Sequence, residues 1–278
     1  MRTITIACLP TLLLGWCFAG NPTFSDANWI GFDDLPGADG TVAATAVDGQ
    51  GNLYVGGVFH TIGNTVAHCI AKWDGHQWST LGGGMDYGVE ALAVSADGSV
   101  YAAGAFTWAT NTDSTTVTVY GIAKWDGEKW SDLGGGVTGG VFGYFFVGAL
   151  AVSGTNLYAG GYFSAMGGVP ANYIARWDGS TWSAVGSGMD DIVYTLKMFG
   201  GNLYAGGSFT YAGGTQARYI ARWDGSSWSA LAGGLDYGVN ELAMSGTNLY
   251  VGGNFNTAFN AGGAAVPARY VARWDGSS

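Results

Sequence analysis

Four aspartates recur at matching places in the chain and could ligate a metal ion. Each lies between the end of one apolar run and the start of the next, and they are Asp39, Asp86, Asp190 and Asp236. A ring of carboxylate oxygens is a ligand set that suits Ca²⁺. The alternative is that each aspartate forms a turn, a common use of this residue. In the third unit Val137-Thr138 stands where the other units have an aspartate, which weakens the case for a symmetric metal site. Calcium is the one cofactor that we consider, and no other is expected.

Two glutamates could take part in catalysis. Glu90 and Glu241 fall in apolar runs that we expect to line a central channel. Glycoside hydrolysis needs two carboxylates about 5–10 Å apart, and Glu241 with Asp190 or Asp236 could supply them. A carbohydrate-active enzyme using channel carboxylates is therefore an alternative function. The sequence holds no Gly-x-Ser-x-Gly elbow with a plausible histidine and no phosphate-binding loop.

The composition limits the class of partner. The chain has 278 residues, with 20 acidic and 10 basic side chains and a formal charge of −10. Nucleic acids and anionic membrane surfaces reward clustered Lys and Arg, so neither is an expected partner. The chain also has 50 glycines, and aromatic residues make up 14% of it. Glycine, aromatic residues and short apolar runs together predict many strands joined by tight turns.

The first 20 residues have the pattern of a secretory signal peptide. Arg2 is followed by an apolar run, and Cys17-Phe18-Ala19 places small side chains at −3 and −1 of a cut after Ala19. The run is too short for a good membrane anchor, so we expect no integral span in the mature chain. Residues 21–278 are then one domain of a secreted or cell-surface protein. Cys69 is the one cysteine left in that domain and is expected to be buried in a strand.

The positioning elements come from a repeated unit of about 50 residues. The tryptophan of a Trp-Asp-Gly triplet recurs at positions 73, 125, 177, 223 and 274, and a second tryptophan follows it by five residues at 78, 130, 182 and 228. One copy predicts four short strands at 193–199, 202–205, 219–223 and 228–231. Asp224-Gly225 is a hairpin signal between the last two, and a glycine-rich loop of about ten residues precedes the third.

Repeated four-stranded sheets bury their faces by packing radially on one another, which predicts an all-β fold of the β-propeller type. The repeated tryptophans, such as Trp177 and Trp182, are expected to fill the wedges between sheets rather than bind a ligand.

The unit consists, in order, of Leu-Tyr-x-Gly-Gly, an apolar strand that ends in an aromatic residue and Asp, a short turn, and Trp-x-x-Leu. This order of elements resembles a kelch-type blade. The pattern covers nearly all of residues 41–278. The Ala-Arg/Lys-Trp-Asp-Gly-x-x-Trp variant also resembles repeats of secreted bacterial propellers and the propeller part of fungal Rax2-like surface proteins. The chain has Trp-Asp-Gly where kelch repeats have Tyr-Asp-Pro. A WD40 resemblance ranks second, because the Gly-His element is absent and the period is longer.

The two ends of the sequence predict a closed ring. The fifth unit reaches Trp274-Asp-Gly before its fourth strand, while Asn28-Trp29-Ile-Gly-Phe32 matches a fourth strand with no first three before it. We expect five blades, with residues 28–32 completing the sheet that begins at 239. Closure would remove an open sheet edge. The alternative is that the chain is a segment of a longer propeller.

Departures from the repeat indicate where a ligand would bind, because loops on a rigid scaffold carry binding. The second unit inserts residues 107–117 and the third inserts 142–146. Four aromatic residues in or beside these insertions are expected to form a contact patch: Trp108, Tyr144, Phe145 and Phe146. The main functional expectation is a non-enzymatic extracellular or cell-surface scaffold that binds a protein or a glycan. A structural segment of a larger surface protein is a further alternative.

Overall fold

The computed structural model describes residues 35–140 and 144–276, and this part of the chain is all-β. It contains no helix long and apolar enough to cross a membrane. The predicted signal peptide and the predicted closing strand at 28–32 lie outside the described residues.

Five antiparallel sheets follow one another along the chain. The strands of the first four sheets, from the innermost outward, are β1 (Thr41–Val47), β2 (Leu53–Val58), β5 (Ile70–Trp73) and β6 (Trp78–Thr80); β8 (Val89–Val94), β9 (Val100–Gly104), β12 (Ile122–Trp125) and β13 (Trp130–Asp132); β15 (Phe146–Ser153), β16 (Asn156–Tyr162), β19 (Ile174–Trp177) and β20 (Trp182–Ala184); and β21 (Val193–Phe199), β22 (Asn202–Gly207), β25 (Ile220–Trp223) and β26 (Trp228–Ala230). The fifth sheet contains β28 (Val239–Ser245), β29 (Asn248–Gly253) and β32 (Val271–Trp274).

Short strands lie in the connections between these sheets and within them. They are β3 (Thr61–Ile62), β4 (Thr65–Val66), β7 (Gly84–Met85), β10 (Trp108–Thr110), β11 (Thr116–Thr118), β14 (Val137–Gly139), β17 (Ala165–Met166), β18 (Val169–Pro170), β23 (Tyr211–Ala212), β24 (Thr215–Gln216), β27 (Gly234–Leu235), β30 (Thr257–Phe259) and β31 (Ala265–Pro267). Two of them form a small hairpin between the second and third strands of each large sheet, where the sequence predicted only a glycine-rich loop. The other three, β7, β14 and β27, lie in connections between large sheets and pair with β10, β17 and β30 of such hairpins.

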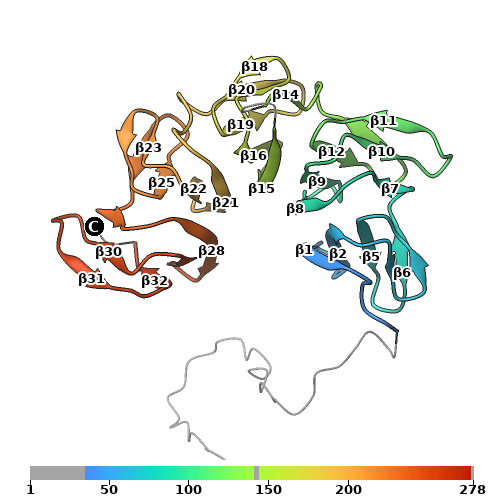
Figure 1. Ribbon diagram of the computed structural model, residues 1–278, viewed down its shortest axis with the longest axis horizontal. Coiled ribbons are helices and arrows are strands. Elements are labelled where there is room, and N and C mark those ends of the chain that lie inside the picture. The colour runs from blue at the N-terminus through green and yellow to red at the C-terminus, as the bar shows by residue number, and fades with distance from the viewer. Residues whose placement is uncertain (1–34, 141–143, 277–278) are drawn as a thin grey trace, which may run out of the picture.

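The five sheets are arranged as an arc around a common centre (Figure 1). Strands β1, β8, β15, β21 and β28 face that centre, and the outer strands point away from it. This is the radial arrangement of a β-propeller, as predicted. Figure 1 shows β1 and β28 at opposite ends of the arc. The predicted ring closure depends on residues 28–32 and remains a prediction.

Each sheet is built from the turn and tryptophan signals of the repeat. In the fourth sheet Trp223 pairs with Trp228 across the Asp224-Gly225 turn. Asp224 closes that turn by accepting the backbone N–H groups of Ser226 and Ser227, both at 2.8 Å. These hydrogen bonds, with further ones from the two serine hydroxyls, hold the pKa of the Asp224 carboxyl well below its ordinary value. The carboxylate therefore serves the turn and is committed to local structure.

The second tryptophan of the unit is buried in four sheets, at Trp78, Trp130, Trp182 and Trp228. This confirms the prediction that these residues pack in the core. Cys69 is also buried, but it lies immediately before β5 rather than within it. Burial raises the pKa of its thiol, so the neutral form is favoured.

Candidate functional site

One face of the arc collects the loops that connect the sheets. In the fourth sheet the first residue of the inner strand, Val193, pairs with Gly207 at the end of β22, and Gly206 pairs with Ile220 at the start of β25. The start of the first strand, the end of the second and the start of the third therefore share one edge. The fourth strand also ends there, because Ala230 pairs with Ala221. Each connection to the next sheet consequently runs along the same face.

This face carries many tyrosines. Some of them precede an inner strand, one ends a second strand and the others precede a third strand. We call this set the tyrosine face: Tyr87, Tyr120, Tyr144, Tyr162, Tyr173, Tyr219, Tyr237 and Tyr270. Tyr144 is 77% exposed, and Tyr87, Tyr120, Tyr237 and Tyr270 are exposed as well. Two pairs of rings stack within the region, Tyr219 on Tyr237 at 6.1 Å and Phe146 on Tyr162 at 6.4 Å. The result is a series of aromatic surfaces supplied by several sheets.

Four of these tyrosines have a positive φ angle, which side chains normally avoid: Tyr120, at 34°, and three that share one position of the repeat. The φ angles of Tyr173, Tyr219 and Tyr270 are 62°, 72° and 64°. Each is held by two backbone hydrogen bonds; for Tyr219, its N–H donates to the Phe209 carbonyl and its own carbonyl accepts from Gly207. A left-handed conformation costs about 1–2 kcal/mol for a residue other than glycine. Glycine would avoid that cost, so the strain suggests that the tyrosine side chain has a role.

The second sheet shows the unstrained version of this position. Gly121 has φ 81° and makes the same two backbone bonds, donating to Phe106 and accepting from Gly104. Comparison of the five repeats at this column, which reads Cys69, Gly121, Tyr173, Tyr219 and Tyr270, could have revealed the special backbone from sequence. The periodicity of apolar residues could not, because it contains no information about the sign of φ.

The four aromatic residues predicted as a contact patch divide into two groups. Trp108 is 47% exposed in β10, and Tyr144 is exposed on the tyrosine face. Phe145 is half-buried and packs against the core of the third sheet, and Phe146 is half-buried beneath Tyr162. Trp108 and Tyr144 are therefore available to a ligand, whereas Phe145 packs on the core and Phe146 stacks on Tyr162. Binding by any of the four remains a prediction.

Each of the four repeated aspartates accepts hydrogen bonds from the small hairpin of the sheet that follows it in the chain. Asp86 accepts the backbone N–H groups of Thr107 and Trp108 at 2.8 and 2.9 Å. Asp39, Asp190 and Asp236 make the equivalent pairs of bonds to residues 60–61, 210–211 and 256–257. Hydrogen bonds from these backbone groups lower the pKa of the Asp39 and Asp236 carboxyls. The aspartates thus act as anchors that fix each hairpin to the connection that leads into its own sheet.

A metal site is not apparent in this arrangement. Within residues 35–140 and 144–276, no group of three or more His, Cys, Asp or Glu side chains could hold a metal ion. His60 and His68 lie edge to face with ring centroids 5.8 Å apart, but His76 belongs to a turn at the other end of β5. The calcium ring remains a prediction, and the observed bonds to the four aspartates account for their recurrence without an ion.

The inner strands line an open polar cavity of about 350 Å³ at the centre of the arc. Glu90, Tyr194, Lys197 and Glu241 contribute to its lining. Glu241 accepts hydrogen bonds from the Thr195 hydroxyl at 3.2 Å and from the Leu242 N–H at 3.0 Å. The structure brings Glu90 and Glu241 to one cavity, as their predicted place in the channel requires. Asp190 and Asp236 do not line it, so the carboxylate pairs that we considered for catalysis are not assembled there.

Comparison with known proteins supports the fold. No family model and no curated protein sequence matches the chain. Among solved structures, the chain is similar to the computationally designed Ika8 protein, with a TM-score of 0.52 and 16% identity over 87% of this chain and 65% of that one. It is also similar to a chain of a mitotic checkpoint complex (TM-score 0.50, 16% identity, 93% and 74% coverage). The extracellular domain of a putative one component system, BT4673 from B. thetaiotaomicron, gives a TM-score of 0.50 at 11% identity, with 77% and 26% coverage. At these identities the likeness concerns the fold alone.

Proposed function

We propose that this chain is a non-enzymatic β-propeller with kelch-like repeats, secreted or held at the cell surface, that binds a glycan or a protein there. The observation that carries the proposal is the tyrosine face. Exposed aromatic side chains concentrated on one surface mark interaction sites, and tyrosine offers a large, rigid contact area with a polar hydroxyl. The signal-like residues 1–20 support export.

Of the two ligand classes, a neutral glycan fits the surface better. The rings project from several sheets along the face, which suits an extended chain of sugar rings stacking on successive aromatic surfaces. The formal charge of −10 makes the protein a poor receptor for an anionic ligand. A globular protein partner would be expected to need a continuous apolar core to its interface, whereas the exposed rings here are separated by glycine-rich and polar loops.

The strained tyrosines support the same proposal. Tyr173 is half-buried, and burial together with the nearby Asp191 carboxylate raises the pKa of its hydroxyl. Like any tyrosine hydroxyl, this group is protonated at neutral pH and can donate a hydrogen bond. An uncharged donor beside an aromatic ring is suited to sugar hydroxyls.

Screening the mature protein on an array of neutral polysaccharides, with CaCl₂ and with EDTA, tests the proposal. We expect binding to a glycan that is independent of the divalent cation and is not accompanied by release of shorter sugars. Release of sugars would favour the enzyme alternative and direct attention to Glu90 and Glu241. Binding only to a protein from the same cell surface would show that the ligand class is wrong.

A further inference from the structure

The tyrosine face contains contacts between two repeated positions at the junctions of neighbouring sheets. One position lies immediately before each third strand, and the other lies two residues before a repeated valine of the next inner strand. At the junction of the fourth and fifth sheets these positions hold Tyr219 and Tyr237, whose rings stack at 6.1 Å. At the junction of the second and third sheets they hold Gly121 and Phe145, and a methyl group on this glycine would lie 2.9 Å from Phe145 Cε2. The residues at these two positions therefore decide what a junction presents to a ligand.

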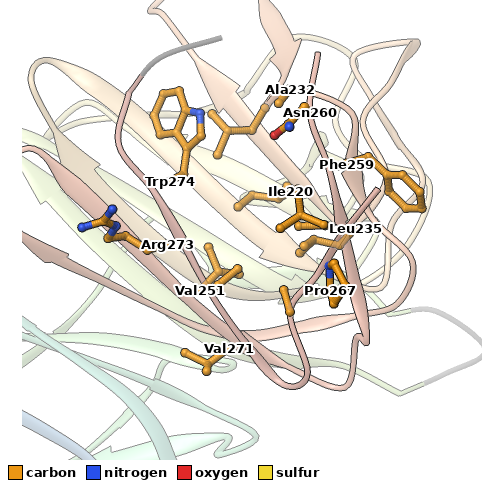
Figure 2. Close-up of a pocket in the computed structure, with 16 residues that line it drawn as sticks. Ile220, Ala232, Leu235, Val251, Phe259, Asn260, Pro267, Val271, Arg273 and Trp274 are labelled. Carbon is orange, nitrogen blue, oxygen red and sulfur yellow. The ribbon is translucent and has the colours of Figure 1, made fainter. Parts of the chain in front are cut away.

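The junction of the fourth and fifth sheets presents mainly apolar surface. An apolar cavity of about 280 Å³ lies between these sheets, and Ile220, Leu235 and Val251 are among its lining residues (Figure 2). Tyr219 packs against the buried cluster that contains the same three side chains. Aromatic and apolar surface of this kind can stack on the face of a sugar ring, but it does not select a charged one.

The junction of the third and fourth sheets differs by one carboxylate. The position two residues before the repeated valine reads, from the second sheet to the fifth, Tyr87, Phe145, Asp191 and Tyr237. The connection that carries Asp191 is fixed to the third sheet, because the Met189 N–H donates to the Asn172 carbonyl at 3.1 Å. Asn172 is followed by Tyr173, the residue immediately before the third strand. A carboxylate is thus placed at the junction with Tyr173, where the other junctions have a ring.

Two tyrosine rings lie at this junction at an angle to each other. The ring centroids of Tyr162 and Tyr173 are 6.2 Å apart, and the ring planes are inclined by 43°. Phe146 stacks on Tyr162 at 6.4 Å, which helps to hold that ring in place. Two rings inclined in this way can turn their faces toward one bound group, which a parallel stack cannot do. A cation within about 6 Å of such a face is attracted by the ring.

The Asp191 carboxylate has capacity for a ligand. One of its oxygens accepts the Ile192 N–H at 2.7 Å, and the other has no hydrogen-bond partner in the part of the chain that the structure describes. Asp190, by contrast, uses both oxygens to hold the β23 hairpin. Burial and the charge of Asp191 raise the pKa of the Tyr173 hydroxyl, and no basic group contributes to that shift. A half-buried carboxylate without a balancing cation favours a positively charged ligand.

We propose that Tyr162, Tyr173 and Asp191 form a subsite for a protonated amino group, and that the glycan bound by the tyrosine face carries unacetylated amino sugars. This inference rests on the proposed binding of a glycan and adds a charge to one of its sugars. The ammonium group lies against the ring faces and donates a hydrogen bond to Asp191, while uncharged sugars stack on rings at the other junctions. The formal charge of −10 attracts such a ligand. An amino sugar offers a ring face for stacking beside its ammonium group, whereas a lysine side chain offers none.

Calorimetric titration of the mature protein with three matched tetrasaccharides tests the subsite. They are the β-1,4-linked tetramers of glucosamine, N-acetylglucosamine and glucose, compared at a mildly acidic pH at which the free sugar amine is protonated and aspartate is ionised. Chain length and linkage are the same in all three, so the comparison isolates the charge. Since a cation–π contact and a partly exposed ion pair each contribute modestly, we expect the glucosamine tetramer to bind about fivefold or more tightly than the other two.

Three variants assign this preference to the junction. Asp191→Asn removes the charge but retains an acceptor for the Ile192 N–H, and Asp191→Tyr introduces the residue found at Tyr87 and Tyr237. Both should abolish the preference for glucosamine and leave the affinity for the uncharged tetramers unchanged. The matched control is Glu128→Gln, which removes one charge from an exposed turn at the opposite end of β12 and should keep the preference.

The outcomes separate this inference from the proposed function. Equal affinity for all three tetramers, or a preference that survives Asp191→Asn, would overturn the amino-group subsite and leave glycan binding in place. A tetralysine peptide that bound as tightly as the glucosamine tetramer would overturn the assignment of the ammonium group to a sugar. Binding of none of the tetramers would contradict both the subsite and the proposed binding of a glycan.

Discussion

The indole Nε1–H of Trp130 donates a 2.8 Å hydrogen bond to the main-chain carbonyl of Leu81, forty-nine residues earlier. Trp182 bonds to Leu133 and Trp228 bonds to Val185 in the same way, at 2.6 and 2.9 Å. Each bond joins the outer strand of one sheet to the strand end of the sheet before it. A repeated sequence signal, the second tryptophan, is thereby converted into a repeated connection between sheets.

Replacement of one such tryptophan should destabilise the protein through the carbonyl that it leaves behind. Trp182→Phe retains an aromatic ring but leaves the buried Leu133 carbonyl without its donor. An unsatisfied buried acceptor costs about 1–3 kcal/mol, and we expect the free energy of unfolding, measured in urea, to fall by about that amount. The control Trp108→Phe changes a half-exposed ring and should alter stability by no more than about 0.5 kcal/mol. Equal effects of the two substitutions would contradict the role given to the indole hydrogen bond.

The repeated aspartates can be tested as hairpin anchors. Asp236 accepts the N–H groups of Asn256 and Thr257 through one oxygen, which an asparagine could also supply. We expect Asp236→Asn to lower the melting temperature less than Asp236→Ala, by the same margin in CaCl₂ and in EDTA. A calcium site would give a different pattern: Asp236→Asn would be as harmful as Asp236→Ala, and the harm would appear only when calcium is present.

Asp97 gives a pH-dependent contribution whose sign is defined. The Ser95 hydroxyl and the Ser99 N–H donate to its carboxylate and lower its pKa to about 2. The ordinary pKa of an unfolded aspartate is about 3.9. Because the folded pKa is the lower one, the stabilisation is complete above about pH 4 and is lost as the pH falls through about 2.

Comparison of Asp97→Ala with the parent protein measures this effect. The difference in the free energy of unfolding should be constant at neutral pH, shrink below about pH 4 and be small near pH 2. A difference that persisted unchanged at pH 2 would mean that the carboxylate charge is not its source.

The strained tyrosines should show opposite effects on stability and on binding. Tyr270→Gly removes an exposed side chain from a position with φ 64°. Relief of about 1–2 kcal/mol of backbone strain is partly offset by the flexibility of glycine in the unfolded chain, about 0.5–1 kcal/mol. We therefore expect unchanged or slightly raised stability together with weaker glycan binding. Tyr270→Ala should weaken binding without the gain in stability. A clear loss of stability in the glycine variant would show that Tyr270 serves packing.

The repeat allowed the large sheets to be predicted in detail. Residues 193–199 were predicted as an inner strand, and β21 has those bounds. Trp223 and Trp228 end and begin adjacent strands, as the Asp-Gly turn between them requires. These features depend on local turn chemistry and apolar patterning, which are visible in one sequence. The small hairpins were missed because β23 and β24 are two residues each, too short for any period.

The candidate binding surface was only partly predictable. Exposure of Trp108 and Tyr144 followed from their place in insertions, but the tyrosines that precede the third strands were not singled out. Their surface position depends on the pairing of Gly206 with Ile220 and on the left-handed backbone at Tyr219. Neither can be read from apolar periodicity. The packing of Phe145 and Phe146 was likewise decided by tertiary contacts with the third sheet.

The most direct test of the central claim is the affinity of the mature protein and its variants for the best glycan from the array. Tyr237→Ala and Tyr87→Ala remove exposed rings of the tyrosine face, and Glu90→Gln and Glu241→Gln change the central cavity. We predict at least a tenfold loss of affinity, about 1.4 kcal/mol, for each tyrosine variant and unchanged affinity for each glutamine variant. Retained affinity in the tyrosine variants, or affinity lost only when Glu90 or Glu241 is changed, would contradict the account.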